Sequence, residues 1–158
     1  MTSATHGGDT FMMSGQDNRE GDPPNKIPIA LTATVNGSKV NISGPSGPFI
    51  AGKDTGAWQF DFTLYDNTGG LDVQFDSLDC ADNLATCPPT GSGDNSSQIG
   101  GVTKNNSATP KTAGFTDNNS NKAKDGPMNV SFQWNFTCND PSKTVGAYDP
   151  LISNGGRT

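Results

Sequence analysis

One peptide bond in the sequence has an intrinsic reactivity, the Asp149-Pro150 bond of the step Tyr148-Asp149-Pro150. The aspartate carboxyl can attack its own main-chain carbonyl and close a five-membered anhydride. The leaving group is a tertiary amide nitrogen, which is easier to protonate than an ordinary amide. In solution this reaction needs acid, but in a fold a held geometry, a twisted amide or a neighbouring proton donor can take the place of the acid. A second carboxylate is the obvious helper group. When two carboxyls lie close together, the pKa of one is raised and that of the other is lowered, so that one can give a proton while the other accepts one.

The local pattern predicts where this bond lies. Asp149 alternates with Val145, Ala147 and Leu151, so the pattern places its carboxyl on the apolar face of the last strand. Desolvation on that face would raise the pKa of the carboxyl. Pro150 removes one ladder hydrogen bond and therefore favours an edge strand.

Two other Asp-Pro steps provide an internal comparison. Asp22-Pro23 and Asp140-Pro141 lie in polar tail or turn contexts, where Asp-Pro is ordinary turn chemistry. Two interpretations of Asp149-Pro150 remain open, a reactive bond and a kink in an edge strand. The residues taken alone favour the kink.

The other residue types that carry chemistry do not form a recognisable set. The single histidine, His6, lies in a polar N-terminal stretch, so the predicted folded part cannot supply a Ser-His-Asp or Cys-His arrangement. The spacing of Cys80 and Cys87 does not match a zinc site, and we predict no metal or cofactor. A further group of acidic residues matches no calcium loop, and a solvated acidic edge is the favoured interpretation: Asp72, Asp76, Asp79 and Asp82.

Composition narrows the function classes. The chain has 158 residues, 30% of them hydrophobic, and a net charge of −6. It has no lysine and arginine cluster, which disfavours nucleic-acid binding and binding to anionic membranes. It also lacks an apolar run long enough to span a bilayer or to act as a signal peptide, so we expect a cytoplasmic protein. In that setting Cys80 and Cys87 are expected to be reduced rather than bridged, and an odd third residue, Cys138, argues against a disulfide framework.

Alternating hydrophobic residues predict an all-β fold. Residues 27–42 alternate on both sides of Asn36-Gly37, which is a strong hairpin signal, and residues 58–75 predict a second hairpin. Alternation returns in residues 130–138 and 145–152, and the apolar faces of 58–64 and 130–138 are the expected halves of the core. The pattern predicts an antiparallel β-sandwich of about six to eight short strands.

The same pattern divides the chain into regions. Residues 1–25 are polar and predict a disordered N-terminal arm, and residues 26–158 predict a single β-sandwich domain. Residues 89–126 are dominated by Gly, Ser, Asn, Thr and Lys and predict a long polar loop that contains at most one short strand, at its apolar island 99–102.

The last thirty residues resemble a known family. Val130-Ser-Phe-Gln-Trp-Asn-Phe, a short polar turn, and Val145-Gly-Ala-Tyr-Asp-Pro-Leu-Ile resemble the end of the DP-EP family of small bacterial β-sandwich proteins. The stretch is also similar to the end of inclusion-body proteins of the AidA type. The resemblance covers about a fifth of the chain. It implies a β-sandwich, and, since the DP-EP family includes a self-processing aspartic peptidase, it implies cleavage at Asp149-Pro150.

Two functional hypotheses follow. The first is autoproteolysis at Asp149-Pro150, a single-turnover event that would release residues 150–158. Its helper acid is not assigned by any motif; Asp61 is the one carboxyl in the middle of a confident strand, but it alternates to the face opposite Trp58. No lysine that could trap an anhydride lies within the two matched strands. The alternative is a non-catalytic sandwich that binds a ligand such as a carbohydrate, with Trp58 or Trp134 as stacking residues, or that assembles into a homo-oligomer.

Overall fold

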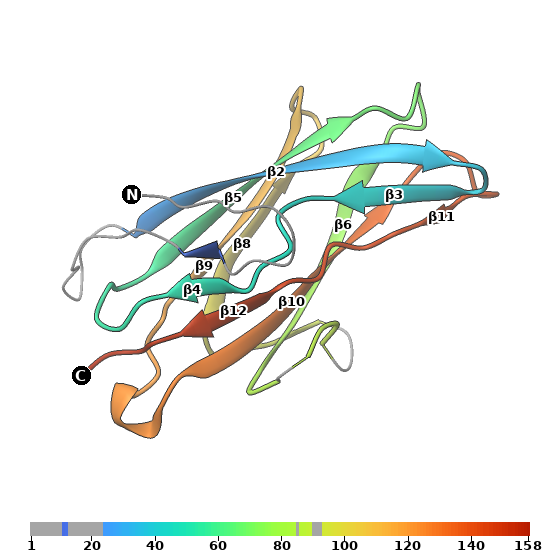
Figure 1. The fold of residues 1–158 in the computed structure, drawn as a ribbon. Coiled ribbons are helices and arrows are strands. Elements are labelled where there is room, and N and C mark those ends of the chain that lie inside the picture. Colours follow the sequence, from blue (N-terminus) through green and yellow to red (C-terminus); the bar gives the residue numbers. More distant parts are fainter. Residues whose placement is uncertain (1–10, 13–23, 85, 90–92) are drawn as a thin grey trace.

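Two six-stranded sheets face each other across a hydrophobic core in the computed structural model, which describes residues 11–12, 24–84, 86–89 and 93–158 (Figure 1). The first sheet has the strand order β1 (Phe11–Met12), β4 (Phe49–Ala51), β12 (Leu151–Asn154), β10 (Met128–Thr137), β6 (Gln74–Asp82) and β7 (Asp94–Asn95). The second has the order β11 (Thr144–Val145), β3 (Lys39–Ser43), β2 (Asn25–Asn36), β5 (Trp58–Asp66), β9 (Lys111–Asp117) and β8 (Ile99–Asn105).

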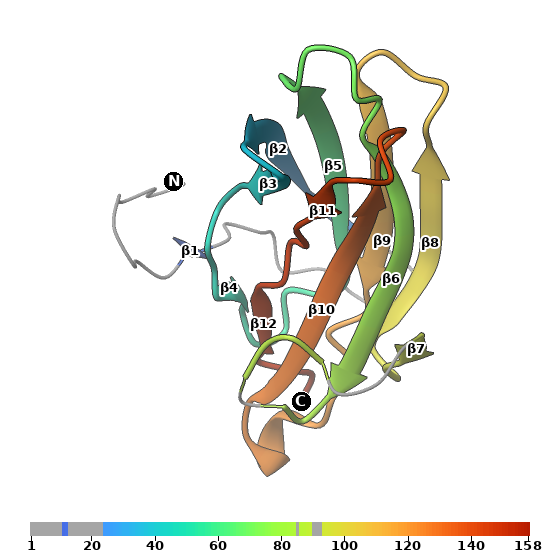
Figure 2. The ribbon, with the colours of Figure 1, turned by 90° about the vertical axis from the view of Figure 1, so that its right-hand side faces the viewer.

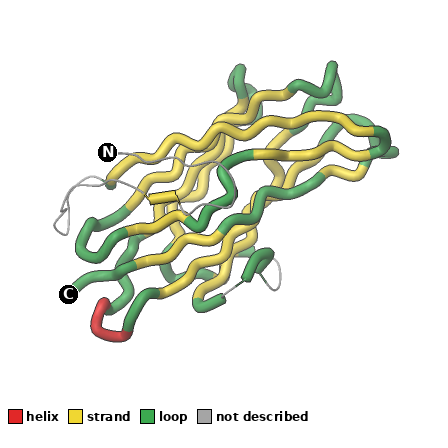
Figure 3. Tube along the Cα trace, viewed as in Figure 1, coloured by secondary structure: helices red, strands yellow, loops and turns green. Residues whose placement is uncertain are grey.

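Strands dominate the part of the chain that the structure describes, as predicted. Figure 3 shows one short helical segment, the 3-10 turn η1 (Ala123–Asp125). None of the described residues belongs to a helix with the length and hydropathy needed to cross a membrane. The all-β class is therefore confirmed.

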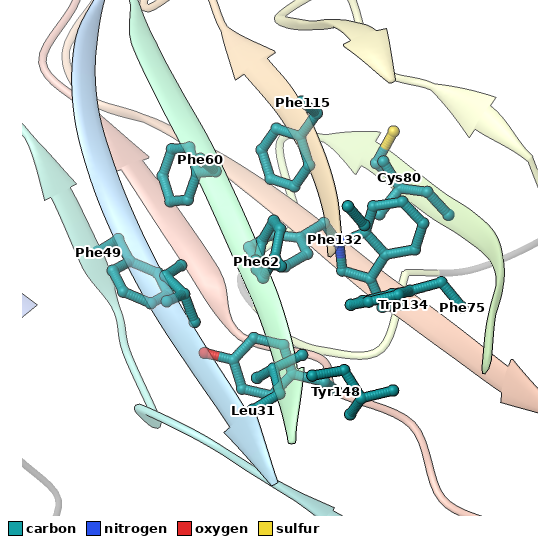
Figure 4. Packing of buried hydrophobic residues seen from close by; sticks show 14 of the residues in the cluster. Leu31, Phe49, Phe60, Phe62, Phe75, Cys80, Phe115, Phe132, Trp134 and Tyr148 are labelled. Atoms are coloured by element: carbon teal, nitrogen blue, oxygen red, sulfur yellow. The ribbon is translucent and has the colours of Figure 1, made fainter. Parts of the chain in front are cut away.

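The core forms where the sequence alternation predicts it. In β5 the side chains of Phe60 and Phe62 are buried, and in β10 those of Phe132 and Trp134 are buried. The Phe60 and Phe132 rings lie 6.3 Å apart between centroids, and those of Phe62 and Trp134 lie 5.9 Å apart, in edge-to-face geometry (Figure 4). Each buried aromatic side chain contributes about 1.5–3 kcal/mol relative to its exposed state. These contacts join the two sheets.

The strand count and the strand directions differ from the prediction of about six to eight antiparallel strands. The described residues form twelve strands, six in each sheet, and several of these are only two residues long. The hairpin of β2 and β3 is antiparallel as predicted, but β2 pairs with β5 in parallel over nine residue pairs, from Asn25↔Trp58 to Ala33↔Asp66. Side-chain alternation has period 2 in both kinds of ladder, so it does not reveal the direction of the partner strand.

The second predicted hairpin is wrong. After β5 the chain passes to the other sheet, where β6 pairs with β10 instead of β5. The Asp66 carboxylate stabilises the segment between β5 and β6, because it accepts hydrogen bonds from Thr68 N (3.0 Å) and Val73 N (2.9 Å). A Gly-rich turn between two alternating runs is compatible with a hairpin and also with a change of sheet.

The predicted loop at 89–126 is also wrong. It contains β7, β8 and β9, and β9 is an interior strand between β5 and β8. In β9 the alternating residues Ala113, Phe115 and Asp117 point inward and are buried. One alanine and one aspartate on the inward face leave only a weak apolar signal in the sequence.

The expected disordered arm, 1–25, falls mostly outside the described residues, which also omit His6 and the Asp22-Pro23 step. Within it, Phe11–Met12 forms β1 and pairs in parallel with β4, and β2 already begins at Asn25. These two segments are ordered parts of the sheets, contrary to the expectation.

Candidate functional site

The last segment of the chain crosses from one sheet to the other, and Asp149-Pro150 lies at the end of this crossing. Thr144 and Val145 form β11, which pairs with β3 in the second sheet, whereas β12 pairs with β10 and β4 in the first sheet (Figure 2). The single strand predicted over 145–152 is therefore two strands. A Cβ atom on Gly146 would lie 3.3 Å from Val40 O, so glycine suits the close approach at which Gly146 N donates to Val40 O.

Tyr148 fixes the crossing from the inside. Its ring is buried and lies 6.3 Å from the Phe62 ring and 6.1 Å from the Phe132 ring. Its hydroxyl donates a hydrogen bond of 2.5 Å to Pro45 O. Its main chain exchanges two hydrogen bonds with Trp134, at 2.9 and 3.1 Å. Burial, together with the negative charge of Asp149, raises the pKa of the Tyr148 hydroxyl.

Asp149 lies on the outside, which corrects its predicted burial on the apolar face. Tyr148, Pro150 and Ile152 are buried, whereas the intervening Asp149 is exposed. The side chains alternate as predicted, but the residues that point into the core are Tyr148, Pro150 and Ile152. Asp149, which alternates with them, therefore points away from the core. Partial desolvation nevertheless raises the pKa of the Asp149 carboxyl, against a smaller opposing effect of a hydrogen bond with its own main chain.

Pro150 leads into an interior strand, not an edge strand as predicted. It is buried and immediately precedes β12, which lies between β10 and β4. The register of the bridge between Trp134 and Tyr148 and of the Ser131↔Leu151 pair places Pro150 opposite Phe132, where proline has no N–H to donate to Phe132 O. The Pro150 carbonyl accepts a hydrogen bond of 3.4 Å from Phe132 N. Together with the bonds of Tyr148, it anchors both sides of the Asp149-Pro150 bond to β10.

An open pocket of about 240 Å³ adjoins this bond. One wall is the segment 147–150 and the other is the segment 42–46, which leads out of β3. We call it the Asp149 pocket. It gives water access to the Asp149 side of the peptide.

The structure does not bring Asp61 to this pocket. Asp61 is exposed in the middle of β5, where it lies opposite Pro28 and Gly114 and accepts a hydrogen bond of 3.1 Å from Gln59 Nε2. It is not among the residues that line the Asp149 pocket. The helper carboxylate, for which the sequence offers no motif, is therefore not Asp61.

The lysines do not reach the pocket either. Lys143 Nζ donates to Gly37 O at 2.8 Å. Lys122 and Lys124 line a different pocket, beyond the other end of β12. A lysine that traps an anhydride at Asp149 is thus not supplied by these three residues.

Cys87 and Ser131 are neighbours of Asp149 that no pattern in the sequence singles out. Ser131 faces outward on β10, yet it is fully buried, and its side chain interacts with the Cys87 thiol from the segment that follows β6. Burial raises the pKa of Cys87, the Ser131 hydroxyl lowers it, and the negative charge of Asp149 raises it. The charge of Asp149 thus shifts the pKa of Cys87 in the same direction as burial does.

The cysteines are unpaired, as the sequence predicts. Cys80, Cys87 and Cys138 are all free thiols, and the Cys80 thiol donates to Asp94 Oδ1 at 3.0 Å. Burial, with Asp94 beside it, raises the pKa of Cys80 to about 12. Cys80 points into the core beside Phe132, whereas Cys87 lies on the outer face of the same sheet.

The comparison step Asp140-Pro141 has a different environment. The Asp140 carboxylate accepts hydrogen bonds from Ser142 N (2.9 Å) and Ser142 Oγ (2.7 Å), and these bonds lower the pKa of Asp140. The pKa of Asp149 shifts in the opposite direction. The two Asp-Pro bonds thus differ in the protonation of the carboxyl that would attack.

The two tryptophans do not offer exposed rings. Trp58 and Trp134 are both buried in the core. The stacking role considered for a carbohydrate ligand is therefore not available to them in this fold. A search of known protein families, curated proteins and solved structures returned no match to this chain.

Proposed function

We propose that the protein cleaves its own chain at the Asp149-Pro150 bond. The observation that carries the proposal is the anchoring of Tyr148 and Pro150 to β10, with Asp149 between them exposed beside an open pocket. The raised pKa of Asp149 and the C-terminal resemblance to the DP-EP family add support. The β-sandwich that the resemblance implies is compatible with an all-β fold of two sheets of mixed strand direction.

The reaction needs only Asp149 and one water molecule. An Oδ atom of the protonated carboxyl attacks the Asp149 carbonyl carbon, the bond to the Pro150 nitrogen breaks, and the carboxyl proton passes to that nitrogen. The products are a cyclic anhydride at Asp149 and a free proline amine. Water then opens the anhydride and leaves two carboxyl groups on residue 149. A raised pKa helps because it keeps more of the carboxyl protonated near neutral pH.

The fold changes the expected outcome of cleavage. The sequence pattern predicts release of residues 150–158, but β12 pairs with β10 over four residues and with β4 over three. Gly155 N donates to Ala51 O at 2.7 Å, and Arg157 N donates to Asn121 O at 2.8 Å. The C-terminal piece therefore stays bound in the sheet, and the product is a nicked protein of native shape.

Intact mass spectrometry under denaturing conditions tests the proposal. Wild-type protein incubated near pH 6 is expected to yield two species, residues 1–149 and 150–158, that co-elute in native size-exclusion chromatography. Asp149→Asn is expected to remain intact, and the matched variant Asp140→Asn is expected to cleave like wild type. A single full-length mass after days of incubation would refute the proposal.

The alternative is a non-catalytic β-sandwich that binds a ligand. A second pocket, remote from Asp149 and lined by cations, favours it.

A further inference from the structure

Four basic side chains gather around one pocket of about 460 Å³, in a protein whose net charge is −6. They are Lys53, Lys122, Lys124 and Arg157, four of the ten lysine and arginine residues of the chain. Ala123 and Thr158 complete the lining. We call this the basic pocket. It lies beyond the C-terminal end of β12, whereas Asp149 precedes the N-terminal end of that strand.

The C-terminal tail, which looks merely polar in the sequence, builds this pocket. Arg157 N donates to Asn121 O at 2.8 Å, and Arg157 O accepts from Ala123 N at 2.9 Å, so the tail is held against the start of η1. On the other side, Asp54 N donates to Gly156 O at 2.8 Å. The basic residues thus come from three chain segments whose main chains are fixed to one another.

Glycines make the close approach possible. A Cβ atom on Gly155 would collide with the main chain of Lys53, and one on Gly156 would collide with Asn121. Gly156 also has φ +76°, in the left-handed region that favours glycine. The Gly155-Gly156 pair therefore sets Arg157 in place between Lys53 and Lys122.

Among the described residues, no carboxylate lies within ion-pair distance of the four basic side chains, although the charges of Lys53 and Asp54 attract each other from farther away. In the part of the chain that the structure describes, the one ion pair within 4.0 Å joins Lys111 and Asp72, away from this pocket. The nearby Asp54 carboxylate accepts both Thr158 N and Thr158 Oγ1, each at 2.8 Å. Arg157 Nε is buried and has no hydrogen-bond acceptor among the described residues. The Arg157 side chain as a whole is half-buried and lines the pocket, so it is open to a ligand there.

We propose that the basic pocket binds a small oxyanion ester, a phosphate or sulfate monoester. The Arg157 guanidinium presents the donors that suit a tetrahedral oxyanion, and the three lysines add positive charge. Ala123 and the methylene stems of the lysines provide a nonpolar wall for the organic part of the ester. This site is independent of the proposed cleavage at Asp149.

Titration of ¹⁵N-labelled Asp149→Asn protein tests the proposal without interference from self-cleavage. Phenyl phosphate and phenyl sulfate are the ester probes, inorganic phosphate is the probe without an organic part, and phenol is the uncharged probe. We expect saturable amide shifts at 122–124 and 157–158 with an ester, weaker binding of inorganic phosphate, and none of phenol. Binding should weaken as salt is added.

Variants locate the site. Arg157→Gln should weaken ester binding about ten-fold, and Lys124→Gln, which changes an exposed side chain, about three-fold. Lys39→Gln removes the same charge from exposed Lys39 on β3 and should leave binding unchanged. Thermal unfolding of each variant checks that it is folded. Absence of saturable shifts with either ester, or equal weakening by Lys39→Gln and Lys124→Gln, would overturn the proposal. Equal affinity for inorganic phosphate and phenyl phosphate would overturn the ester assignment.

Discussion

Tyr148 and Trp134 bond to each other through their main chains in both directions, at 3.1 Å from Tyr148 N to Trp134 O and at 2.9 Å in return. This isolated antiparallel bridge ties the crossing segment to β10 one residue before Asp149. It places the Tyr148 ring in the core and the Asp149 carboxyl outside. The reactivity proposed for Asp149-Pro150 depends on this anchoring.

The anchor can be weakened at the Tyr148 hydroxyl. Tyr148→Phe removes the hydrogen bond to Pro45 O and should lower the free energy of unfolding by about 1–2 kcal/mol. Tyr65→Phe is the matched control, since Tyr65 is 48% exposed; it should have no measurable effect. Urea unfolding measures both. Equal effects of the two variants would show that the Tyr148 hydroxyl is not part of the anchor.

Removal of the Asp149 charge should change the reactivity of Cys87. Burial is the largest cause that raises the pKa of Cys87, and the Asp149 carboxylate adds to it. Asp149→Asn should therefore lower that pKa and speed alkylation of Cys87 at pH 8 by about two-fold. Peptide mass spectrometry after timed iodoacetamide treatment gives the rate, with Cys138 as the internal reference. If the ratio of the Cys87 and Cys138 alkylation rates were the same in wild type and Asp149→Asn, the charge of Asp149 would have no effect on the pKa of Cys87.

Buried Asp117 should make stability depend on pH. Burial raises its pKa to about 7, while hydrogen bonds from Asn154 (2.8 Å) and Asn119 N (3.3 Å) act in the opposite direction and the charge of Asp82 adds to the rise. A folded-state pKa above the unfolded one gives stability that is complete below about pH 4 and is lost as the pH rises through about 7.

Asp117→Asn isolates this effect. From pH 4 to pH 7.5, the free energy of unfolding of wild type should fall relative to that of Asp117→Asn by up to about 4 kcal/mol. Chemical denaturation at several pH values measures the difference. Parallel curves for the two proteins would mean that Asp117 titrates alike in the folded and unfolded chains.

The tail that forms the basic pocket should tolerate no side chain at Gly156. Gly156→Ala should lower the free energy of unfolding by more than about 3 kcal/mol, because the new methyl group collides with Asn121. Gly69 has the same φ of +76° and nothing near its missing side chain, so Gly69→Ala should cost only about 1 kcal/mol. Thermal and urea unfolding compare the two. Similar losses would indicate that only the backbone angle matters at Gly156.

Elements with large alternating side chains are predictable from the sequence, and those without them are not. Phe60 and Phe62 in β5, and Phe132 and Trp134 in β10, identify the two halves of the core by their alternation alone. In contrast, β9 presents only Phe115 as a large inward side chain. Partner direction is not predictable for β2 and β5, because parallel and antiparallel strands share the same side-chain period.

The candidate sites are predictable in part. Residue chemistry identifies the Asp149-Pro150 bond, but the side on which Asp149 lies depends on where the chain leaves one sheet for the other. Cys87 interacts with Ser131, which belongs to a different segment of the chain, so no local sequence pattern predicts this interaction. Arg157 gains its role from main-chain bonds to Asn121 and Ala123, more than thirty residues away in the sequence.

The most direct test compares the cleavage rate of Asp149-Pro150 in the folded and the unfolded chain at one pH. Wild-type protein is held at pH 5, with and without denaturant, and the fragments are counted by mass spectrometry over several days. Asp140-Pro141, in an exposed turn, is the internal reference. We predict that the folded protein is cut at Asp149-Pro150 alone, and at least ten-fold faster than the unfolded chain, about 1.4 kcal/mol of barrier lowering. Equal rates in both states, or equal cutting at Asp140-Pro141 in the folded protein, would contradict the proposed self-cleavage.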